Sequence, residues 1–476
     1  MKTLTRRSFL KTSLVATGTA LSWPARSWSQ VAGANGDIRV GVVGIRSRGE
    51  SHINAFKKMD GVRLVALCDA DANVLDARAK PLGEDGLSIT KYTDIRKLLE
   101  NKEIDAISTA TPNHWHALVS IWAVQAGKDV YVEKPVSHNV WEGRKIVEAA
   151  RKYNRIVQTG TQGRSNHAIR EAFAWVREGN LGKIKVARGL CYKRRPSIGK
   201  VDGPQPIPEG IDYDLWCGPA AKLPLMRKNL HYDWHWVWNT GCGDIGNQGI
   251  HEMDKARWAL GKAELSPRVI SVGGRLGYVD DGETPNTMFT IHDYGDALLI
   301  FEVRGLPTSA DSKEMDSYKG ERVGQVIECE GGYLSGSSAY DNEGKKIKQF
   351  KGNEDHFANF IKAVRSRNAS DLNADILEGH LSSALCHTSN ISYRLGKETG
   401  QGEIREALKS NSAALETLSR FEEHLAANNV KLDMTRATLG AFLEMDGKAE
   451  KFKSNPKANA LLTREYRKPF VVPGTV

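Results

Sequence analysis

Short β-rich runs alternate with helix-like stretches between residues 37 and 160, and this alternation limits the possible folds more than any other feature. A strand followed by a helix and a second strand favours a parallel sheet with covering helices and right-handed crossovers. Gly61 and Gly127 close two of the helix-like stretches, as expected for left-handed cap residues. We therefore predict a doubly wound parallel sheet with strands at 38–44, 62–68, 89–92, 104–109, 130–132 and 155–158.

The pattern changes after residue 160. Runs such as KIKVARGLCYKR, RVISVGGRLGYV and DALLIFEVRG are typical of strands, and several follow one another without a helix between them. This indicates an α+β domain with a mostly antiparallel sheet. Helical patterns follow at 355–366 and 375–395, and the polar end of the chain predicts a helix near 404–426 and an irregular tail.

The first thirty residues have the layout of a secretory signal. A basic start precedes an apolar stretch at 14–23, which is too short to span a bilayer, and small residues follow near 25–29. Arg6 and Arg7, followed by Ser-Phe-Leu-Lys, resemble the address read by the Tat exporter, although a frayed basic tail is the alternative. We predict a Tat-type signal peptide at 1–30, the Tat machinery as a partner, and an exported, periplasmic protein.

Charge and cysteine content narrow the choice of partners. The formal net charge is +10, and the leader supplies five basic residues and no acids, so the rest of the chain carries about +5. This balance does not call for an anionic partner, and we predict no nucleic-acid binding and no stable membrane insertion. The six cysteines form no CxxC pair and the histidines no HExxH pair, so we predict buried cysteines and no metal.

The loop in RVGVVGIRSRGESH, after the first predicted strand, almost matches a dinucleotide-binding fingerprint. Gly44 and Gly49 occupy the first and third glycine positions, and Arg46 replaces the second. Asp69 ends the second strand, where a carboxylate can accept both ribose hydroxyls and repel a 2′-phosphate. A solvated turn, with Asp69 as a helix N-cap, is the alternative. The context favours NAD over NADP, with Arg46 or Arg48 reaching the pyrophosphate.

Two further motifs follow the fourth and fifth predicted strands. TPNHWHA starts at Thr111, and EKP starts at Glu133. Because ligands of open α/β sheets bind at the carboxyl ends of the strands, both motifs should face one crevice. Pro135 favours an extended Lys134, whose ammonium would point into this crevice and exchange protons with a hydroxyl if its pKa is lowered. In isolation, a Lys-Pro pair is more often only a turn.

Together with GDIGNQGIHEMD further along the chain, these motifs resemble the Gfo/Idh/MocA family of glucose-fructose oxidoreductases and inositol dehydrogenases. The resemblance extends from residue 37 to about 395, and the leader is similar to those of exported members. It implies a Rossmann domain and a second domain with an open-faced sheet, through which members often form dimers or tetramers. We accordingly predict an NAD-binding Rossmann domain at 37–160, a substrate and oligomerisation α+β domain at 161–400, and a helical extension and tail at 401–476.

The resemblance also implies that Lys134 relays the proton and that a D-x-x-x-H motif faces the reacting carbon. His251 is the histidine of this motif, but Asn247 replaces the acid, and an amide cannot take a proton from a hydroxyl. We therefore predict a proton path through Lys134 and His251, with Asp254 orienting the imidazole and Asp244 as a second candidate acid. A capped helix start with a satisfied histidine is the alternative.

Aromatic residues crowd the segment LHYDWHWVWNTGCGD, in which tryptophan recurs at every second position. This period is typical of one face of a buried strand, but aromatic rings also suit the apolar faces of a pyranose. Both interpretations, a core and a sugar platform, stay open. The candidate substrate contacts are Trp234, His235, Trp238, Asn247 and His251.

The expected function is an NAD-dependent oxidoreductase that transfers hydride between the cofactor and a hydroxyl of a sugar, polyol or glycoside. An exported enzyme would have to hold its NAD tightly and regenerate it in the site. The first alternative is an NAD-dependent glycoside hydrolase that oxidises its substrate transiently, and the second is a sugar-binding protein with a vestigial Rossmann domain. We expect a homo-oligomer, with Asn113 and His116 near the nicotinamide or the substrate. The predicted cofactor contacts are Gly44, Ile45, Arg46, Arg48, Gly49, Asp69, Thr111, Pro112, Asn113, His116, Glu133 and Lys134.

Overall fold

The computed structural model describes residues 36–476, and the predicted leader at 1–30 lies outside them. The N-terminal domain contains a six-stranded parallel sheet in the order β3-β2-β1-β4-β5-β6. This is the order of a Rossmann sheet, so the predicted fold is confirmed. The strands are β1 (Ile38–Val43), β2 (Val62–Cys68), β3 (Thr90–Tyr92), β4 (Ala106–Thr109), β5 (Asp129–Val132) and β6 (Val157–Thr159).

Helices cover the Rossmann sheet, and its inner strands are buried as a result. Every residue of β4 and of β5 is buried, which is why these strands carry apolar runs rather than an alternating pattern. The helices of this region are α3 (Arg48–Phe56), α4 (Ala72–Glu84), α5 (Ile95–Glu100), α6 (Asn113–Gln125) and α7 (Val140–Lys152), followed by the 3₁₀ turn η1 (Gln162–Ser165).

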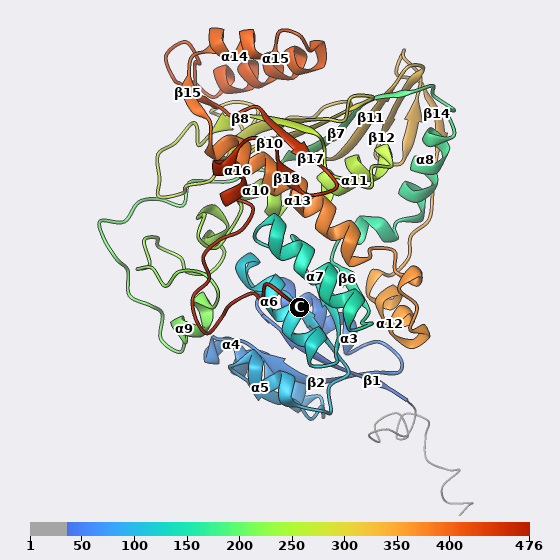
Figure 1. Cartoon of the computed structure of the whole chain (residues 1–476), viewed down its shortest axis with the longest axis vertical. Coiled ribbons are helices and arrows are strands. Elements are labelled where there is room, and N and C mark those ends of the chain that lie inside the picture. Colours follow the sequence, from blue (N-terminus) through green and yellow to red (C-terminus); the bar gives the residue numbers. More distant parts are fainter. Residues whose placement is uncertain (1–35) are drawn as a thin grey trace, which may run out of the picture.

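The second domain is built on a twelve-stranded sheet (Figure 1). Its pairs are antiparallel except for β7 with β10, so the predicted, mostly antiparallel sheet is confirmed. The strands are β7 (Ile184–Tyr192), β8 (Arg268–Gly274), β9 (Thr287–Asp293), β10 (Leu298–Arg304), β11 (Val323–Cys329), β12 (Gly332–Ser335), β13 (Ser338–Tyr340), β14 (Lys346–Gln349), β15 (Lys397–Thr399), β16 (Ala437–Leu439), β17 (Leu443–Asp446) and β18 (Lys451–Phe452).

Helices lie on both faces of this larger sheet (Figure 1). Leu299 of β10 packs with the helices α11 (Ile250–Leu260) and α13 (Ile376–Arg394), and its neighbour Ile300 packs on the opposite face with α15 (Ser412–Ala427). The helix predicted near 404–426 is two helices, α14 and α15, because Asn411 caps the second by accepting the Ala414 amide. The helices are α8 (His167–Arg177), α9 (Tyr213–Cys217), α10 (Gly243–Asn247), α11 (Ile250–Leu260), α12 (His356–Ser366), α13 (Ile376–Arg394), α14 (Gln401–Leu408), α15 (Ser412–Ala427) and α16 (Pro456–Ala460), with 3₁₀ turns η2 (Asp233–Trp236) and η3 (Ala369–Asp371).

Two late segments of the chain return to the Rossmann domain. Phe360 of α12 packs in one core with Val40 of β1 and Phe56 of α3. The last residues run down from α16 past α9 and end beside α6 (Figure 1), where Phe470 is buried against Trp115. The tail predicted as irregular therefore contributes to the core of the first domain.

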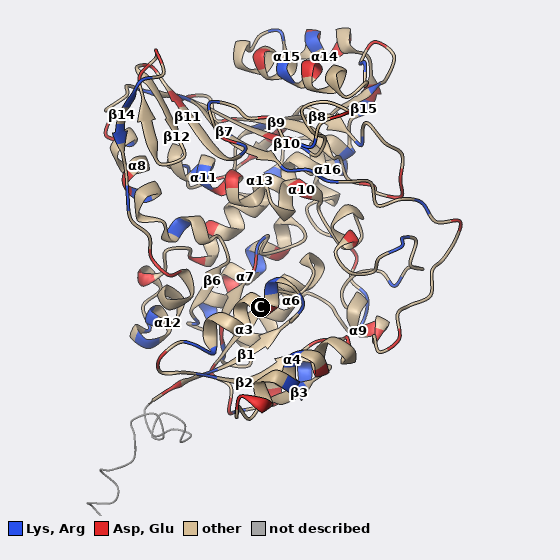
Figure 2. Cartoon of the chain, turned by 180° about the vertical axis from the view of Figure 1, so that it is seen from behind, with Lys and Arg blue, Asp and Glu red and all other residues tan. Residues whose placement is uncertain are grey.

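Basic and acidic side chains are interspersed along both domains (Figure 2). Many form pairs, such as Arg39 with Asp105 at 2.8 Å. Within residues 36–476, no helix is long and apolar enough to cross a membrane. All six cysteines are buried, as predicted, and none of them forms a disulfide.

Candidate active site

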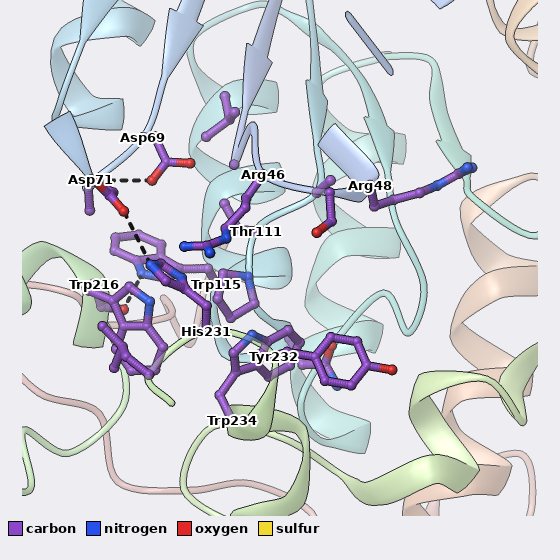
Figure 3. Close-up of a pocket in the computed structure, with 18 of the residues that line it drawn as sticks. Arg46, Arg48, Asp69, Asp71, Thr111, Trp115, Trp216, His231, Tyr232 and Trp234 are labelled. Atoms are coloured by element: carbon purple, nitrogen blue, oxygen red, sulfur yellow. Dashed lines mark hydrogen bonds and ion pairs between the residues drawn. The ribbon is translucent and has the colours of Figure 1, made fainter. Parts of the chain in front are cut away.

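A cleft with a volume of about 910 Å³ opens at the carboxyl ends of the parallel strands. One wall carries Asp69 after β2 and Lys134 after β5. Residues of the second domain, such as Trp216 and Trp234, lie opposite Asp69 (Figure 3). The volume lies within the range of about 300–1,000 Å³ that is usual for ligand sites. All the predicted cofactor contacts line the cleft except Ile45 and Gly49.

The loop between β1 and α3 forms a dinucleotide cradle although Arg46 replaces the middle glycine. Gly44 has a φ of +73°, and a side chain there would come within 2.6 Å of the Thr111 nitrogen. A side chain at Gly49 would overlap the Gly44 carbonyl, so both positions require glycine. Ser47 precedes α3 with a strained φ of 37° and makes no capping bond, which leaves the first amides of α3 without a side-chain cap. Such a helix N-terminus fits a pyrophosphate.

Asp69 lies where the ribose of a dinucleotide is expected. Its carboxylate accepts the backbone N–H of Ile45 at 2.9 Å and that of Asp71 at 3.0 Å. The N-cap of α4 is Asp71, so the alternative role of Asp69 as an N-cap is wrong. Burial raises the pKa of Asp69, while the two amides and the charge of Arg46 act in the opposite direction. The carboxylate lines the cleft and can accept a ribose hydroxyl.

The two arginines of the loop have different partners. Arg48 Nε donates to Glu133 Oε1 at 2.7 Å, and His52 Nε2 lies 3.2 Å from the same oxygen. Although burial opposes ionisation, the His52 hydrogen bond and the Arg48 charge hold the pKa of Glu133 well below its usual range. Arg46 is exposed and lines the cleft, and its guanidinium has no hydrogen bond or ion pair with any described residue (Figure 3). Arg48 therefore ties the loop to the EKP motif, and Arg46 is the loop cation left for a ligand.

Lys134 extends from β5 to the second domain, where its Nζ donates to the Asn247 carbonyl at 2.6 Å. Burial lowers the pKa of Lys134 although Glu133 raises it, and the charge of Arg48 lowers it further. A lysine in such surroundings gives up a proton more readily than an exposed one. Its amino group therefore lies where the two domains meet over the cleft.

His251 lies in the first turn of α11 near Lys134, beside the cleft and not among the residues that line it. Burial and the charge of Lys134 lower the pKa of His251 to about 3, so its imidazole is neutral near pH 7. Asp254 does not orient this ring, because its carboxylate accepts from Arg164 Nε at 2.8 Å and from Ser382 Oγ at 2.7 Å. His251 and Asp254 have the expected helical spacing, but the Asp254 carboxylate is hydrogen-bonded to the buried Arg164 of η1.

The second candidate acid, Asp244, is also engaged. Arg195 donates to its two oxygens at 2.8 and 2.7 Å, and Asn247 Nδ2 lies 3.3 Å from one of them. Asp244 therefore fixes the end of α10, which presents the Asn247 carbonyl to Lys134.

The TPNHWHA motif fastens the two domains together. Asn113 Nδ2 donates to Cys242 Sγ at 3.1 Å. The nitrogens Nδ1 and Nε2 of His116 lie 2.6 and 2.7 Å from the carbonyl oxygens of Pro135 and Thr111. Both side chains border the cleft and are hydrogen-bonded within the protein, and the contacts of His116 hold the EKP motif in place.

The aromatic segment forms the 3₁₀ turn η2, so its interpretation as a strand is wrong. Trp234 stacks on His235 with ring centroids 3.6 Å apart, and both line the cleft. Trp238 lies away from the cleft, with the Arg394 guanidinium 5.1 Å from the centre of its ring. The segment therefore supplies both an aromatic platform and a structural tryptophan.

The long segment between β7 and α10 closes the cleft from the second domain. Leu230, His231 and Tyr232, which begin the aromatic run noted in the sequence, line the cleft, and so does Trp216, which the sequence patterns did not indicate; Figure 3 shows Trp216, His231 and Tyr232. This segment has no sustained helix or strand period, and only its aromatic content could have indicated a site.

These features define the class of the protein. The glycine cradle suits a dinucleotide, and a lysine that exchanges protons beside it suits hydride transfer, so the chain is built as a dinucleotide-dependent oxidoreductase. The family model for the NAD-binding Rossmann fold of an oxidoreductase family matches residues 38–161, and the model for the C-terminal alpha/beta domain of that family matches residues 182–419. The chain belongs to the Gfo/Idh/MocA oxidoreductase family, as its motifs predicted, and its first domain is an NAD-binding Rossmann domain.

Several curated proteins and solved structures are similar to parts of the chain. A glycosyl hydrolase family 109 protein of Shewanella pealeana is 31% identical over 155 residues, which cover 31% of this chain and 33% of that protein. A second such protein, from Shewanella sp. strain ANA-3, is 30% identical over 203 residues, or 38% of this chain and 44% of the relative. The chain thus spans less than half the length of these relatives.

Two solved structures share the fold. The WlbA dehydrogenase of Bordetella pertussis, in complex with NADH and UDP-GlcNAcA, has a TM-score of 0.54 and 20% identity over 73% of this chain and 94% of that one. A putative myo-inositol dehydrogenase of Sinorhizobium meliloti has a TM-score of 0.51 and 16% identity over 74% and 96%.

Proposed function

We propose that the chain is an NAD-dependent oxidoreductase that acts on a CH–OH group of a sugar, polyol or glycoside. The observation that carries this proposal is the place of Lys134, whose amino group reaches the second domain in the same cleft that Asp69 lines. A hydroxyl bound there would lie between the cofactor position and a base. Export by the Tat system and homo-oligomer formation belong to the same proposal, and they rest on the leader sequence and the family resemblance.

We assign proton transfer and binding to the residues that line the cleft, together with His251 beside it. NAD, when bound, accepts the hydride of the carbinol carbon. The neutral amine of Lys134 takes the hydroxyl proton, the neutral His251 accepts a hydrogen bond from the substrate, and the Asn247 amide holds a hydroxyl. Trp234 and His235 offer their stacked rings to an apolar pyranose face. In the direction of ketone reduction, Lys134 returns the proton.

The family 109 relatives favour a second candidate function, an NAD-dependent glycoside hydrolase. Such an enzyme would oxidise one hydroxyl of the sugar, which labilises the glycosidic bond, and would return the hydride after the aglycone has left. Lys134 and His251 would serve in the same places. The two candidates differ in their net reactions: the hydrolase consumes water and leaves NAD unchanged, whereas the dehydrogenase converts NAD to NADH.

Aryl glycosides and free sugars, offered in a panel to the purified NAD-loaded protein, test both candidates. The dehydrogenase should develop the absorbance of bound NADH with a free sugar, polyol or glycoside. The hydrolase should release the phenol with no net NADH. A protein that carries no nicotinamide and ignores added NAD would contradict both and support the vestigial sugar binder, against which the packed Gly44 and Gly49 argue.

Replacing Arg46 by glycine should weaken NAD binding, although it restores the usual glycine fingerprint. A charge-assisted hydrogen bond from the guanidinium to the pyrophosphate contributes about 1.5–3 kcal/mol, which corresponds to roughly a ten- to hundredfold change in Kd. Calorimetric titration of nucleotide-free protein measures the effect, and Arg46→Lys should lose less because it keeps the charge. If Arg46→Gly binds NAD as tightly as the unchanged protein, the loop only tolerates its arginine.

A further inference from the structure

The segment between β7 and α10 crosses from the second domain back to the Rossmann domain. Within it, residues 208–231, which we name the clasp, line the cleft through Leu215, Trp216, Leu230 and His231. They face the end of the cleft that contains Asp69, where the adenosine ribose of a dinucleotide binds. The clasp therefore forms the outer wall of the adenosine half of the site (Figure 3).

The clasp is bonded to the Rossmann domain along the loop after β2. The Asp212 amide donates to the Ala70 carbonyl, and the Ala72 amide donates to the Gly210 carbonyl, both at 2.9 Å. His231 Nε2 lies 3.2 Å from Asp71 Oδ2, across the cleft. While these bonds persist, the clasp cannot move away from the loop that follows β2.

The start of α6 provides a second attachment. Trp115 Nε1 donates to the Leu215 carbonyl at 3.0 Å, and His114 Nε2 lies 2.9 Å from the Trp216 carbonyl. Each of these aromatic residues is buried. The clasp is thus held both at the end of β2 and after β4, on the two sides of the position expected for the adenine.

The end of the chain fastens the clasp from outside. Within residues 464–472, which we name the strap, Arg467 donates to the Asp214 carboxylate at 2.8 Å, to the Asp214 carbonyl at 2.7 Å and to the Gly218 carbonyl at 3.1 Å. The strap is itself anchored by Phe470, which is buried against Trp115 at a centroid distance of 5.4 Å. It lies beyond residue 419, where the match to the family model ends.

We propose that the clasp and strap close the adenosine half of the NAD site and set the rate at which the nucleotide leaves. This inference rests on the proposed function only in that NAD is the bound nucleotide. With the outer wall bonded on three sides, a nucleotide beneath it leaves only when the clasp moves off the Rossmann domain. The strap therefore retains NAD between turnovers, which a redox-neutral cycle in the same site requires.

Release of labelled NAD from the loaded full-length protein, chased with excess unlabelled NAD, tests the proposal. Arg467→Ala removes the side-chain hydrogen bonds from strap to clasp, while the backbone bond from Arg467 to Pro219 remains, and it should speed release on the order of tenfold or more. Lys468→Ala is the matched control, because Lys468 is exposed in the same segment and should leave the rate unchanged. An unchanged release rate in Arg467→Ala would overturn the proposal.

A second variant tests whether the effect on release comes from the contact between Arg467 and Asp214. Asp214→Asn weakens the same contact from the clasp side and should also speed release, and the Arg467→Ala/Asp214→Asn double variant should add little to Arg467→Ala alone. Fully additive effects would contradict a shared contact. If the unchanged protein binds no NAD, the proposed function fails, whereas tight NAD binding with unaltered release in the variants defeats only the clasp and strap.

Discussion

Lys134→Met should reduce hydride transfer by about 10²- to 10⁴-fold while NAD stays bound, because a general base of this kind contributes that range. Methionine fills a similar space but cannot exchange a proton. The bond from Lys134 Nζ to the Asn247 carbonyl is lost, yet neither the glycine cradle nor Asp69 contacts the replaced group. Single-turnover measurements of NADH absorbance in loaded protein would report the chemical step, and nucleotide content would be measured on the same sample.

Lys58→Met is the matched control, since Lys58 is exposed after α3 and should have no effect on turnover. The pH profile gives a second readout. Lys134 acts as a base only when neutral, so oxidation slows as the pH falls through its pKa, which burial and Arg48 place below that of an ordinary lysine. Lys134→Met should lose this decrease of the oxidation rate at low pH, which is the acid limb of the profile. Turnover that persists in Lys134→Met with the limb intact would end the proposed mechanism.

Asp254→Asn should lower the free energy of unfolding by up to about 3–5 kcal/mol, because it removes the buried counter-charge of Arg164 and leaves that arginine only the partly exposed Glu378. Asp254 and Arg164 have 2% and 5% of their side chains exposed, and three hydrogen bonds join them. Urea unfolding followed by tryptophan fluorescence would measure the loss. If Asp254 instead oriented His251, the main effect would be on the pH profile of the reaction and not on stability.

The control for Asp254→Asn is a variant of an ion pair that is exposed to solvent. Glu406 and Lys409 form an exposed pair, with about two thirds of each side chain accessible. Glu406→Gln should therefore change the stability by no more than about 1 kcal/mol. Equal losses of unfolding free energy in Asp254→Asn and Glu406→Gln would show that the buried pair of Asp254 and Arg164 does not stabilise the fold more than an exposed pair.

Local patterns predicted the Rossmann domain well because its architecture repeats a short unit. β-rich runs, capping glycines and right-handed crossovers fix the sheet order, and that order places Gly44, Asp69 and Lys134 at one edge. The positions of these residues in the cleft follow from topology alone. No knowledge of side-chain packing was needed.

The failures concern contacts between residues distant in the sequence. The alternating tryptophans suit a strand or a tight turn equally, and only tertiary packing selects η2. The spacing of His251 and Asp254 indicates that they can meet, but it does not reveal that Arg164 lies closer. Likewise, nothing local in the sequence shows that Arg467 reaches Asp214 from far along the chain.

The return of α12 and of the last residues to the first domain has a consequence for the ancestry of such chains. The Rossmann core includes Phe360 and Phe470, so the polypeptide that completes it comes from three separate stretches. A recombination event that transplanted only the first stretch would expose the apolar surfaces that the other two cover. A stable exchange of the first domain between such chains therefore requires that all three stretches move together.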